Sequence, residues 1–200
     1  MNTAYSVSVQ DQSEAAWEQP SRGVIGMACL IIAESAIFLI FVVAYIYNLG
    51  RSLNGPTPAQ VLEPPVLGTI CLLSSSFAIH LAVSALRRGN ARQYLISLST
   101  TILLGAIFLV TTGQEWYLLI RHKGLTLQVN LFGTTYYALV GLHAAHVLVG
   151  LLLLSIALAI SIGGLATETH AKRVEVLSMY WHFVDAIWVV VFLVVYVLGR

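Results

Sequence analysis

Residues 174–198 read VEVLSMYWHFVDAIWVVVFLVVYVL, an apolar stretch with a histidine and an aspartate near its middle. As a helix it is long enough to cross a bilayer core, for which about 20 residues suffice. An aspartate at the centre of a lipid-facing helix costs roughly 2.5–3.5 kcal/mol, so Asp185 is expected to face protein or water. The helical repeat places the polar residues of this stretch on one stripe with two tryptophans beside it, namely Glu175, Ser178, His182, Asp185, Trp181 and Trp188.

Four further long apolar runs precede this one along the chain. Hydrophobic residues make up 58% of the 200 positions and charged residues 10%, against about 25% charged in a typical soluble domain. Helices satisfy their backbone groups internally, as a lipid environment requires. We therefore predict an all-α integral membrane bundle of five transmembrane helices, at about residues 24–47, 66–86, 94–120, 131–162 and 174–198.

The segments outside these runs are polar. Residues 1–21 form a polar tail without Lys or Arg, and residues 22–200 are predicted to form the five-helix domain. Prolines at positions 56, 58, 64 and 65 predict that the first connection is not helical. A net charge of +1 gives no indication of a nucleic-acid partner.

The cationic residues between the spans predict the orientation. Loops that carry more Lys and Arg tend to face the cytoplasm. One side of the bundle would carry Arg22, Arg87, Arg88, Arg92, Lys172 and Arg173, and the other side Arg51, Arg121, Lys123 and Arg200. We predict an N terminus inside and a C terminus outside.

Two carboxylates lie within other spans. Glu34 lies near the middle of the first span, where it is either a protonated carboxyl bonded to a neighbouring helix or a group that handles protons or contacts a partner. Glu115 precedes Trp116 and Tyr117 near the end of the third span. That composition is typical of a membrane interface, so Glu115 either reaches headgroups and water or serves protons or a partner contact.

Two histidines lie three residues apart in the fourth span, with Gly150 on the same face. His143 and His146 offer two ligands for a metal, but the chain contains no matching Glu-x-x-His or Cys pair. No span has two histidines spaced for haem ligation at both of its ends. We expect interhelical hydrogen bonds from this pair, with the glycine allowing close approach.

Four motifs together resemble one family. They are GM at 26–27 followed by AES at 33–35, LEPPVLGT at 62–69 running to LLSS at 72–75, GLHAAHV at 141–147 with Gly150, and Glu175 with YWHFVD at 180–185 and Trp188. In this order and spacing they resemble subunit III of haem–copper terminal oxidases, in its short five-helix bacterial form. The chain departs from the family at Thr112, where a glutamine is usual, and at Ala144 and Ala145 inside the histidine motif.

The resemblance implies an accessory subunit of a proton-pumping oxidase, located in the bacterial inner membrane. Such a subunit has no redox cofactor of its own; the haems and copper belong to partner subunits. It would stabilise subunit I, support its proton supply and bind phospholipid, with subunit II, possibly a subunit IV, and a respiratory supercomplex as further partners. A cytochrome c oxidase is favoured over a quinol oxidase.

The resemblance also implies roles for individual residues. Glu34 and Glu115 would serve the subunit I contact or the proton supply. The polar seam between the last two spans, or a lipid cleft there, would contain His143, His146, Glu175, His182 and Asp185. Trp181 and Trp188 would pack against lipid tails or subunit I.

Alternative functions come from other classes. A stand-alone proton-coupled transporter would use Glu34, Glu115 and Asp185, and a haem- or metal-binding cytochrome would use the intramembrane histidines. Within the family, the chain could accompany a nitric oxide reductase. Co-purification with haem-containing subunits argues against the transporter, and a colourless purified chain argues against the cytochrome.

Overall fold

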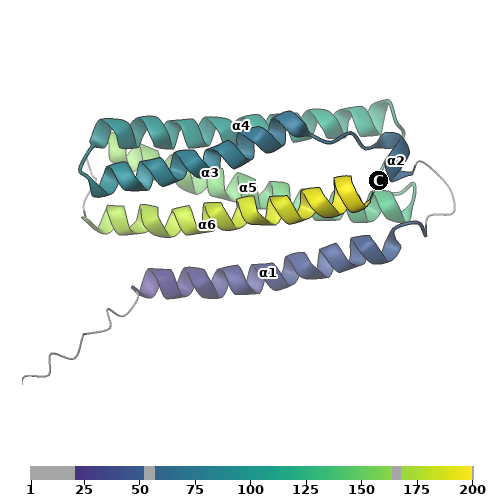
Figure 1. The fold of residues 1–200 in the computed structure, drawn as a ribbon, viewed down its shortest axis with the longest axis horizontal. Coiled ribbons are helices and arrows are strands. Elements are labelled where there is room, and N and C mark those ends of the chain that lie inside the picture. Colours follow the sequence, from purple (N-terminus) through teal and green to yellow (C-terminus); the bar gives the residue numbers. More distant parts are fainter. Residues whose placement is uncertain (1–20, 52–56, 164–167, 200) are drawn as a thin grey trace, which may run out of the picture.

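The protein is a bundle of long helices (Figure 1). The computed structural model describes residues 21–51, 57–163 and 168–199. Its elements are α1 (Arg22–Asn48), α2 (Pro58–Val61), α3 (Val66–Arg87), α4 (Ala91–Arg121), α5 (Leu131–Ile162), α6 (Glu168–Phe192) and a terminal π-helix, η1 (Leu193–Leu198). Five of the helices are long and apolar enough to cross a membrane, which confirms the predicted all-α bundle of five spans. The predicted tail lies outside the described residues up to position 20.

Polar caps explain where the spans begin. Asn90 accepts a hydrogen bond from the backbone N–H of Gln93 at 3.1 Å, so α4 starts at residue 91, before the apolar run predicted from residue 94. Asn130 accepts one from Gly133 N–H at 2.7 Å, and α5 starts at residue 131 as predicted. A capping side chain satisfies a backbone donor that the helix itself leaves unpaired, so helices extend beyond their hydrophobic segments.

The first connection contains a short helix that the prolines were expected to exclude. Pro58 is the first residue of α2, which ends at Val61. Proline lacks a backbone N–H, but the first helical position has no partner for that group in any case. The expectation was therefore wrong at position 58, because proline starts a helix as readily as it interrupts one.

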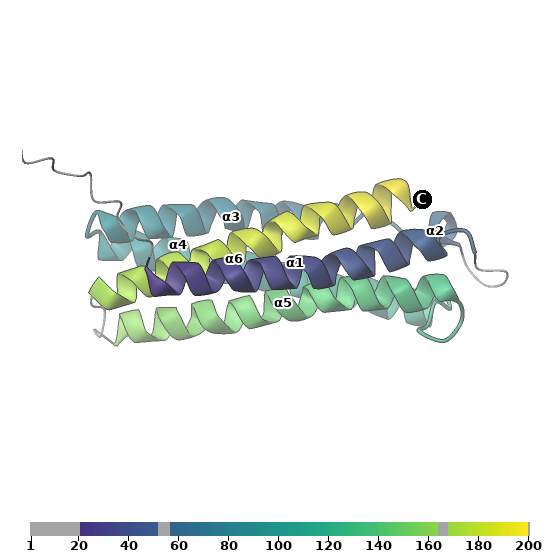
Figure 2. The same cartoon turned by 90° about the horizontal axis from the view of Figure 1, so that it is seen from below.

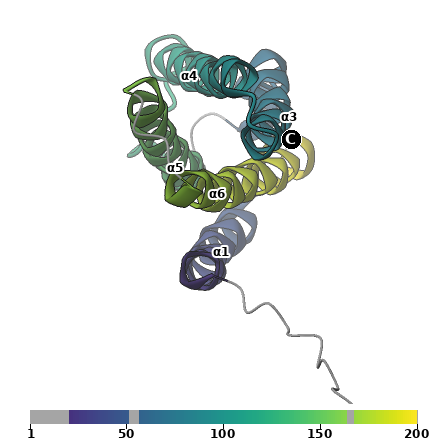
Figure 3. The ribbon, with the colours of Figure 1, turned by 90° about the vertical axis from the view of Figure 1, so that its left-hand side faces the viewer.

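Helices α3, α4, α5 and α6 surround a common core (Figure 3). Each packs against the next in the chain, and α6 closes the ring against α3. Consecutive helices run in opposite directions along the bundle (Figure 1). Helix α1 lies outside this ring, along α5 and α6 (Figures 2 and 3). In the most apolar stretch of α1, only 11% of the residues are buried, whereas the corresponding share in the last span is 50%.

The indole of Trp181 fills the centre of the ring. A Cβ added to Gly105 of α4 would lie 2.8 Å from Trp181 Cη2, and one added to Gly150 of α5 would lie 2.8 Å from Cε3 and Cζ3. The indole is therefore held against two glycines on the neighbouring helices α4 and α5. Its Nε1 donates a hydrogen bond to Ser75 Oγ of α3 at 2.9 Å. One side chain of α6 thus contacts all three other helices of the ring.

Replacing Gly105 by Ala is expected to destabilise the protein by about 1–3 kcal/mol, because the added methyl group overlaps Trp181 and Leu151. Gly113→Ala is a matched control on the same helix, since no atom lies within 4 Å of the added group. We expect this control to be neutral or slightly stabilising. Thermal unfolding in mild detergent, followed by circular dichroism, measures both. Equal stability of the two variants would contradict the close packing of the indole.

Candidate functional site

Glu34 and His146 join α1 to α5. His146 Nε2 lies 3.1 Å from Glu34 Oε2, and the two side chains are 14% and 24% exposed, respectively. His146 Nδ1 lies 2.8 Å from the carbonyl oxygen of Leu142, one turn earlier. Tyr180 of α6 donates to the carbonyl oxygen of His146 at 3.2 Å. Of the two interpretations of Glu34, the structure displays the bond to a neighbouring helix and leaves the carboxyl partly accessible.

The partners of His146 limit the hydrogen-bonding arrangements of this pair. A carbonyl oxygen only accepts, so Nδ1 carries a hydrogen. Either the ring is neutral and Glu34 donates to Nε2 as a carboxylic acid, or an imidazolium donates from Nε2 to a carboxylate. In both states a single proton lies between Nε2 and Oε2.

His143 has different surroundings from His146. It is fully buried, and neither ring nitrogen has a hydrogen-bond partner among the described residues. The ring centroids of Trp188 and Phe108 lie 5.0 and 5.7 Å from that of His143. Both nitrogens of His146 are occupied, so the two histidines do not converge on a common ligand. Within the described residues, no group of three or more His, Cys, Asp or Glu side chains could hold a metal.

Four polar contacts join α6 to α3 along the length of both helices. Glu175 forms an ion pair with Arg87 at one end. His182 Nδ1 lies 2.7 Å from Ser76 Oγ near the middle, next to the bond from Trp181 to Ser75. The fourth contact is from Trp188 Nε1, which donates to Thr69 Oγ1 at 3.1 Å. We call these contacts the α3–α6 seam.

Asp185 lies beside this seam. It is 3% exposed and adjacent to the Ser76 hydroxyl, which is already engaged by His182. Neither carboxyl oxygen makes a hydrogen bond of full geometry to the described residues. A buried intramembrane carboxyl is costly unless it is bonded, and such residues usually mark functional positions. Among the acidic side chains that the structure describes, Asp185 is therefore the one with the fewest hydrogen bonds to the protein.

Residues expected to form one polar seam between α5 and α6 lie in two other interfaces, α3–α6 and α1–α5. Glu175 and His182 face α3 instead of α5, and His146 faces α1. The expectation for the tryptophans was wrong. Trp181 and Trp188 are 0% and 1% exposed, so both pack inside the chain and neither faces lipid or a partner.

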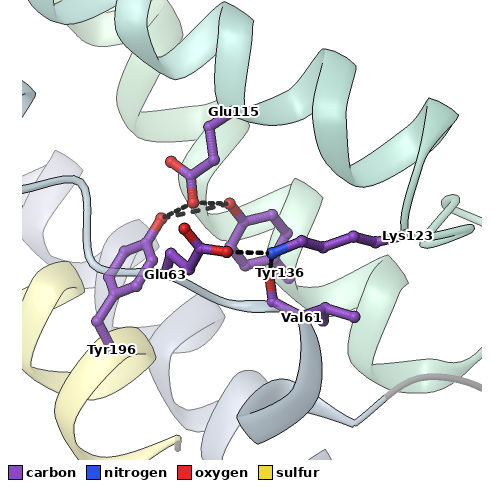
Figure 4. Close-up of polar contacts among 6 residues, drawn as sticks. All are labelled: Val61, Glu63, Glu115, Lys123, Tyr136 and Tyr196. Carbon is purple, nitrogen blue, oxygen red and sulfur yellow. Dashed lines mark hydrogen bonds and ion pairs between the residues drawn. The ribbon is translucent and has the colours of Figure 1, made fainter.

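Glu115 belongs to a third polar group (Figure 4). Its Oε1 accepts hydrogen bonds from Tyr196 of η1 at 2.8 Å and from Tyr136 of α5 at 3.2 Å, and the two phenol oxygens lie 3.3 Å apart. Lys123 lies nearby, with Nζ bonded to the carbonyl oxygen of Val61 at 2.8 Å and to Glu63 Oε1 at 2.7 Å. Helices α4 and α5, η1 and the chain after α2 therefore meet at this end of the bundle.

Sequence reasoning did not identify the partners of these groups. The serine run at positions 74–76 gives a usable signal, because small hydroxyl residues in apolar helices commonly bond across helix interfaces. Tyr196 gives none. It lies in η1, where wider π-helical turns replace the α-helical repeat from which side-chain directions are predicted.

The fold and these contacts define a multi-pass helical membrane protein whose intramembrane polar groups mostly bond to each other. The chain belongs to the cytochrome c oxidase subunit III family, whose sequence model matches residues 19–200. This finding confirms the resemblance that the sequence motifs indicated.

Similar proteins come from bacteria and animals. A cytochrome c oxidase subunit 3 of Synechocystis sp. is 36% identical over 183 residues, which cover 90% of this chain and 77% of the relative. One from Corynebacterium diphtheriae is 34% identical over 190 residues, or 92% of each chain. One from Osphranter robustus is 32% identical over 180 residues, covering 86% of this chain and 67% of the relative.

Replacing Glu34 by Gln is expected to change the free energy of unfolding by less than about 0.5 kcal/mol, because the amide N–H can still donate to His146 Nε2. Glu34→Ala removes that partner and is expected to cost about 1–3 kcal/mol. Thermal unfolding of both variants in mild detergent measures the difference. A destabilisation as large for Gln as for Ala would contradict the bond as described.

Proposed function

We propose that this chain is a non-catalytic accessory subunit of a proton-pumping haem–copper terminal oxidase. The observation that carries the proposal is the family relationship, which extends over all five spans. The haems and copper are assigned to partner subunits. The relatives named above are cytochrome c oxidase subunits, which favours cytochrome c over quinol as the electron donor of the complex.

Helix α1 is proposed as the contact with subunit I. It packs on α5 and α6 along one side, and its other side exposes large apolar residues such as Ile32, Leu39 and Ile40. Glu34 is bonded to α5 yet remains 24% exposed. A partner helix on α1 would cover this apolar face and bring its own groups close to the carboxyl. Subunit II, a subunit IV and a supercomplex remain further proposed partners.

The Glu34–His146 pair is proposed to support the proton supply of subunit I. It holds one proton between two atoms in the middle of a span, and both side chains are partly accessible. An acid and a base in contact can pass the shared proton from one atom to the other while the pair stays neutral overall. Phospholipid binding is proposed as the second supporting role of the chain.

The proposed location is the bacterial inner membrane, with the N terminus inside. The start of α1, the end of α3 and the starts of α4 and α6 lie at the same end of the bundle (Figure 1). Arg22, Arg87, Arg92 and Lys172 belong to these helix ends. Arg51 and Lys123 belong to the opposite end. The excess of cationic residues supports a cytoplasmic position of the first end.

Purification through a tag on the N-terminal tail tests the proposed complex. In mild detergent, we expect haem absorbance, a copper-binding partner identified by mass spectrometry, and oxygen consumption with reduced cytochrome c. A colourless chain, alone or self-associated, would contradict the oxidase assignment. Oxygen consumption with quinol only would contradict the proposed donor.

Glu34→Gln is expected to leave the haem content of the complex unchanged but to shorten the time over which it sustains turnover. The amide keeps the bond to His146 but cannot release a proton. Glu34→Ala is expected to do the same, with an additional loss of stability. The measurement is oxygen consumption over many turnovers, with the haem spectrum as control. Undiminished endurance of the Gln variant would contradict the proton role, and loss of haem would contradict the assignment of Glu34.

A further inference from the structure

A groove of about 650 Å³ opens at the end of the bundle where α4 finishes. On one side lies the chain before and at the start of α3, which includes Glu63 and Pro65. On the other side lie the last turns of α4, with Glu115, and the chain just after α4, with Lys123. Figure 4 shows Glu63, Lys123 and Glu115 gathered there. This volume is in the range of sites for small ligands, about 300–1,000 Å³. The end of a membrane-spanning helix places the groove at the level of lipid headgroups.

The polar groups of the groove have unused hydrogen-bonding capacity. Both tyrosines that contact Glu115 bond to Oε1, and Oε2 accepts no hydrogen bond from the described residues. Lys123 uses two of its three N–H groups, on Val61 and Glu63. A ligand with both an acceptor and a donor can therefore bind without displacing any of these contacts.

The remaining walls of the groove are apolar and open to lipid. Val66, Leu67 and Leu118 line it, with exposed fractions of 55%, 64% and 50%. Apolar side chains beside a polar pocket fit a molecule that has a polar head and hydrocarbon chains. An ion or a small polar solute would make no use of these walls.

The charges of the groove select among headgroups. One lysine lies beside two glutamates, Glu63 and Glu115. An anionic headgroup would bring a further negative charge next to both carboxyl groups. A headgroup that carries a phosphate and a primary ammonium matches both signs, and its N–H groups can donate to carboxylate oxygens. A quaternary ammonium has no N–H to donate.

We propose that this groove binds the headgroup of a zwitterionic phospholipid with a primary amine. Lys123 holds the phosphate, Glu115 and Glu63 hold the ammonium, and the acyl chains extend along Leu67 and Leu118. This inference deepens the proposed lipid-binding role and rests on it. It assigns that role to a defined site at the end of α4.

The test uses the tagged complex, stripped of lipid and placed in nanodiscs of defined composition. Nanodiscs contain either phosphatidylethanolamine or phosphatidylcholine, each mixed with phosphatidylglycerol. Native mass spectrometry releases this chain from the nanodisc and counts the lipids that it retains. The lipids can therefore be counted whether or not haem-containing partners are present. We expect one phosphatidylethanolamine to be retained, and neither of the other two lipids to replace it.

Two variants and one control locate the lipid. Lys123→Gln is expected to reduce retention about ten-fold, the loss of one charge-assisted hydrogen bond. Glu115→Gln keeps an acceptor for both tyrosines but removes a negative charge, so it is expected to reduce the preference for phosphatidylethanolamine over phosphatidylcholine. Arg121→Glu reverses an exposed charge at the same end of α4 but outside the groove, and is expected to retain the lipid.

Each outcome separates this inference from the proposed function. Retention unchanged by Lys123→Gln, or equal retention of all three lipids, would overturn the site. Haem-containing complexes whose groove is protected by subunit I and free of lipid would also overturn it, while supporting the oxidase assignment. Phosphatidylethanolamine bound to a chain that carries no haem partner would support the site and contradict the assignment.

Discussion

The packing of Trp181 is the contact on which the ring of four helices depends. Lipid is as apolar as the helices it surrounds, so helices in a membrane associate through close packing and interhelical hydrogen bonds. Trp181 provides both. Its ring packs against Gly105 and Gly150, and its N–H reaches Ser75, so α6 contacts α3, α4 and α5 through one residue. The α3–α6 seam extends this connection toward both ends of the bundle.

Helix α1 is attached by fewer contacts, and this difference bears on function. Its bond from Glu34 to His146 and its packing on α5 and α6 leave a long apolar face open. A ring of four packed helices with one further, more exposed helix on its outside suits a lateral partner of a larger complex. The intramembrane polar groups fit the same role, because most of them bond within the chain.

The sequence predicts where the spans lie but not which helices their polar side chains contact. Length and hydropathy located all five helices, and residues 131–162 were predicted to the residue. Helical spacing correctly grouped the polar residues of α6 on one stripe but does not say which helix that stripe faces, so His182 was expected to meet α5 and instead meets Ser76 of α3. Glu34 and His146 are separated by 112 positions, and no local pattern pairs them. The direction of the Tyr196 side chain depends on a π-helical turn that hydropathy does not reveal.

A double-mutant cycle between Trp181 and Ser75 tests the central role of this contact most directly. Ser75→Ala leaves a fully buried indole N–H without its acceptor, and Trp181→Phe removes the donor. The free energies of unfolding of the two single variants and the double variant give the coupling between the side chains. We expect the double variant to be more stable than the sum of the single changes implies, by about 0.6 kcal/mol and at most about 1.7 kcal/mol. Strictly additive losses would contradict the contact as the connection between α6 and the rest of the ring.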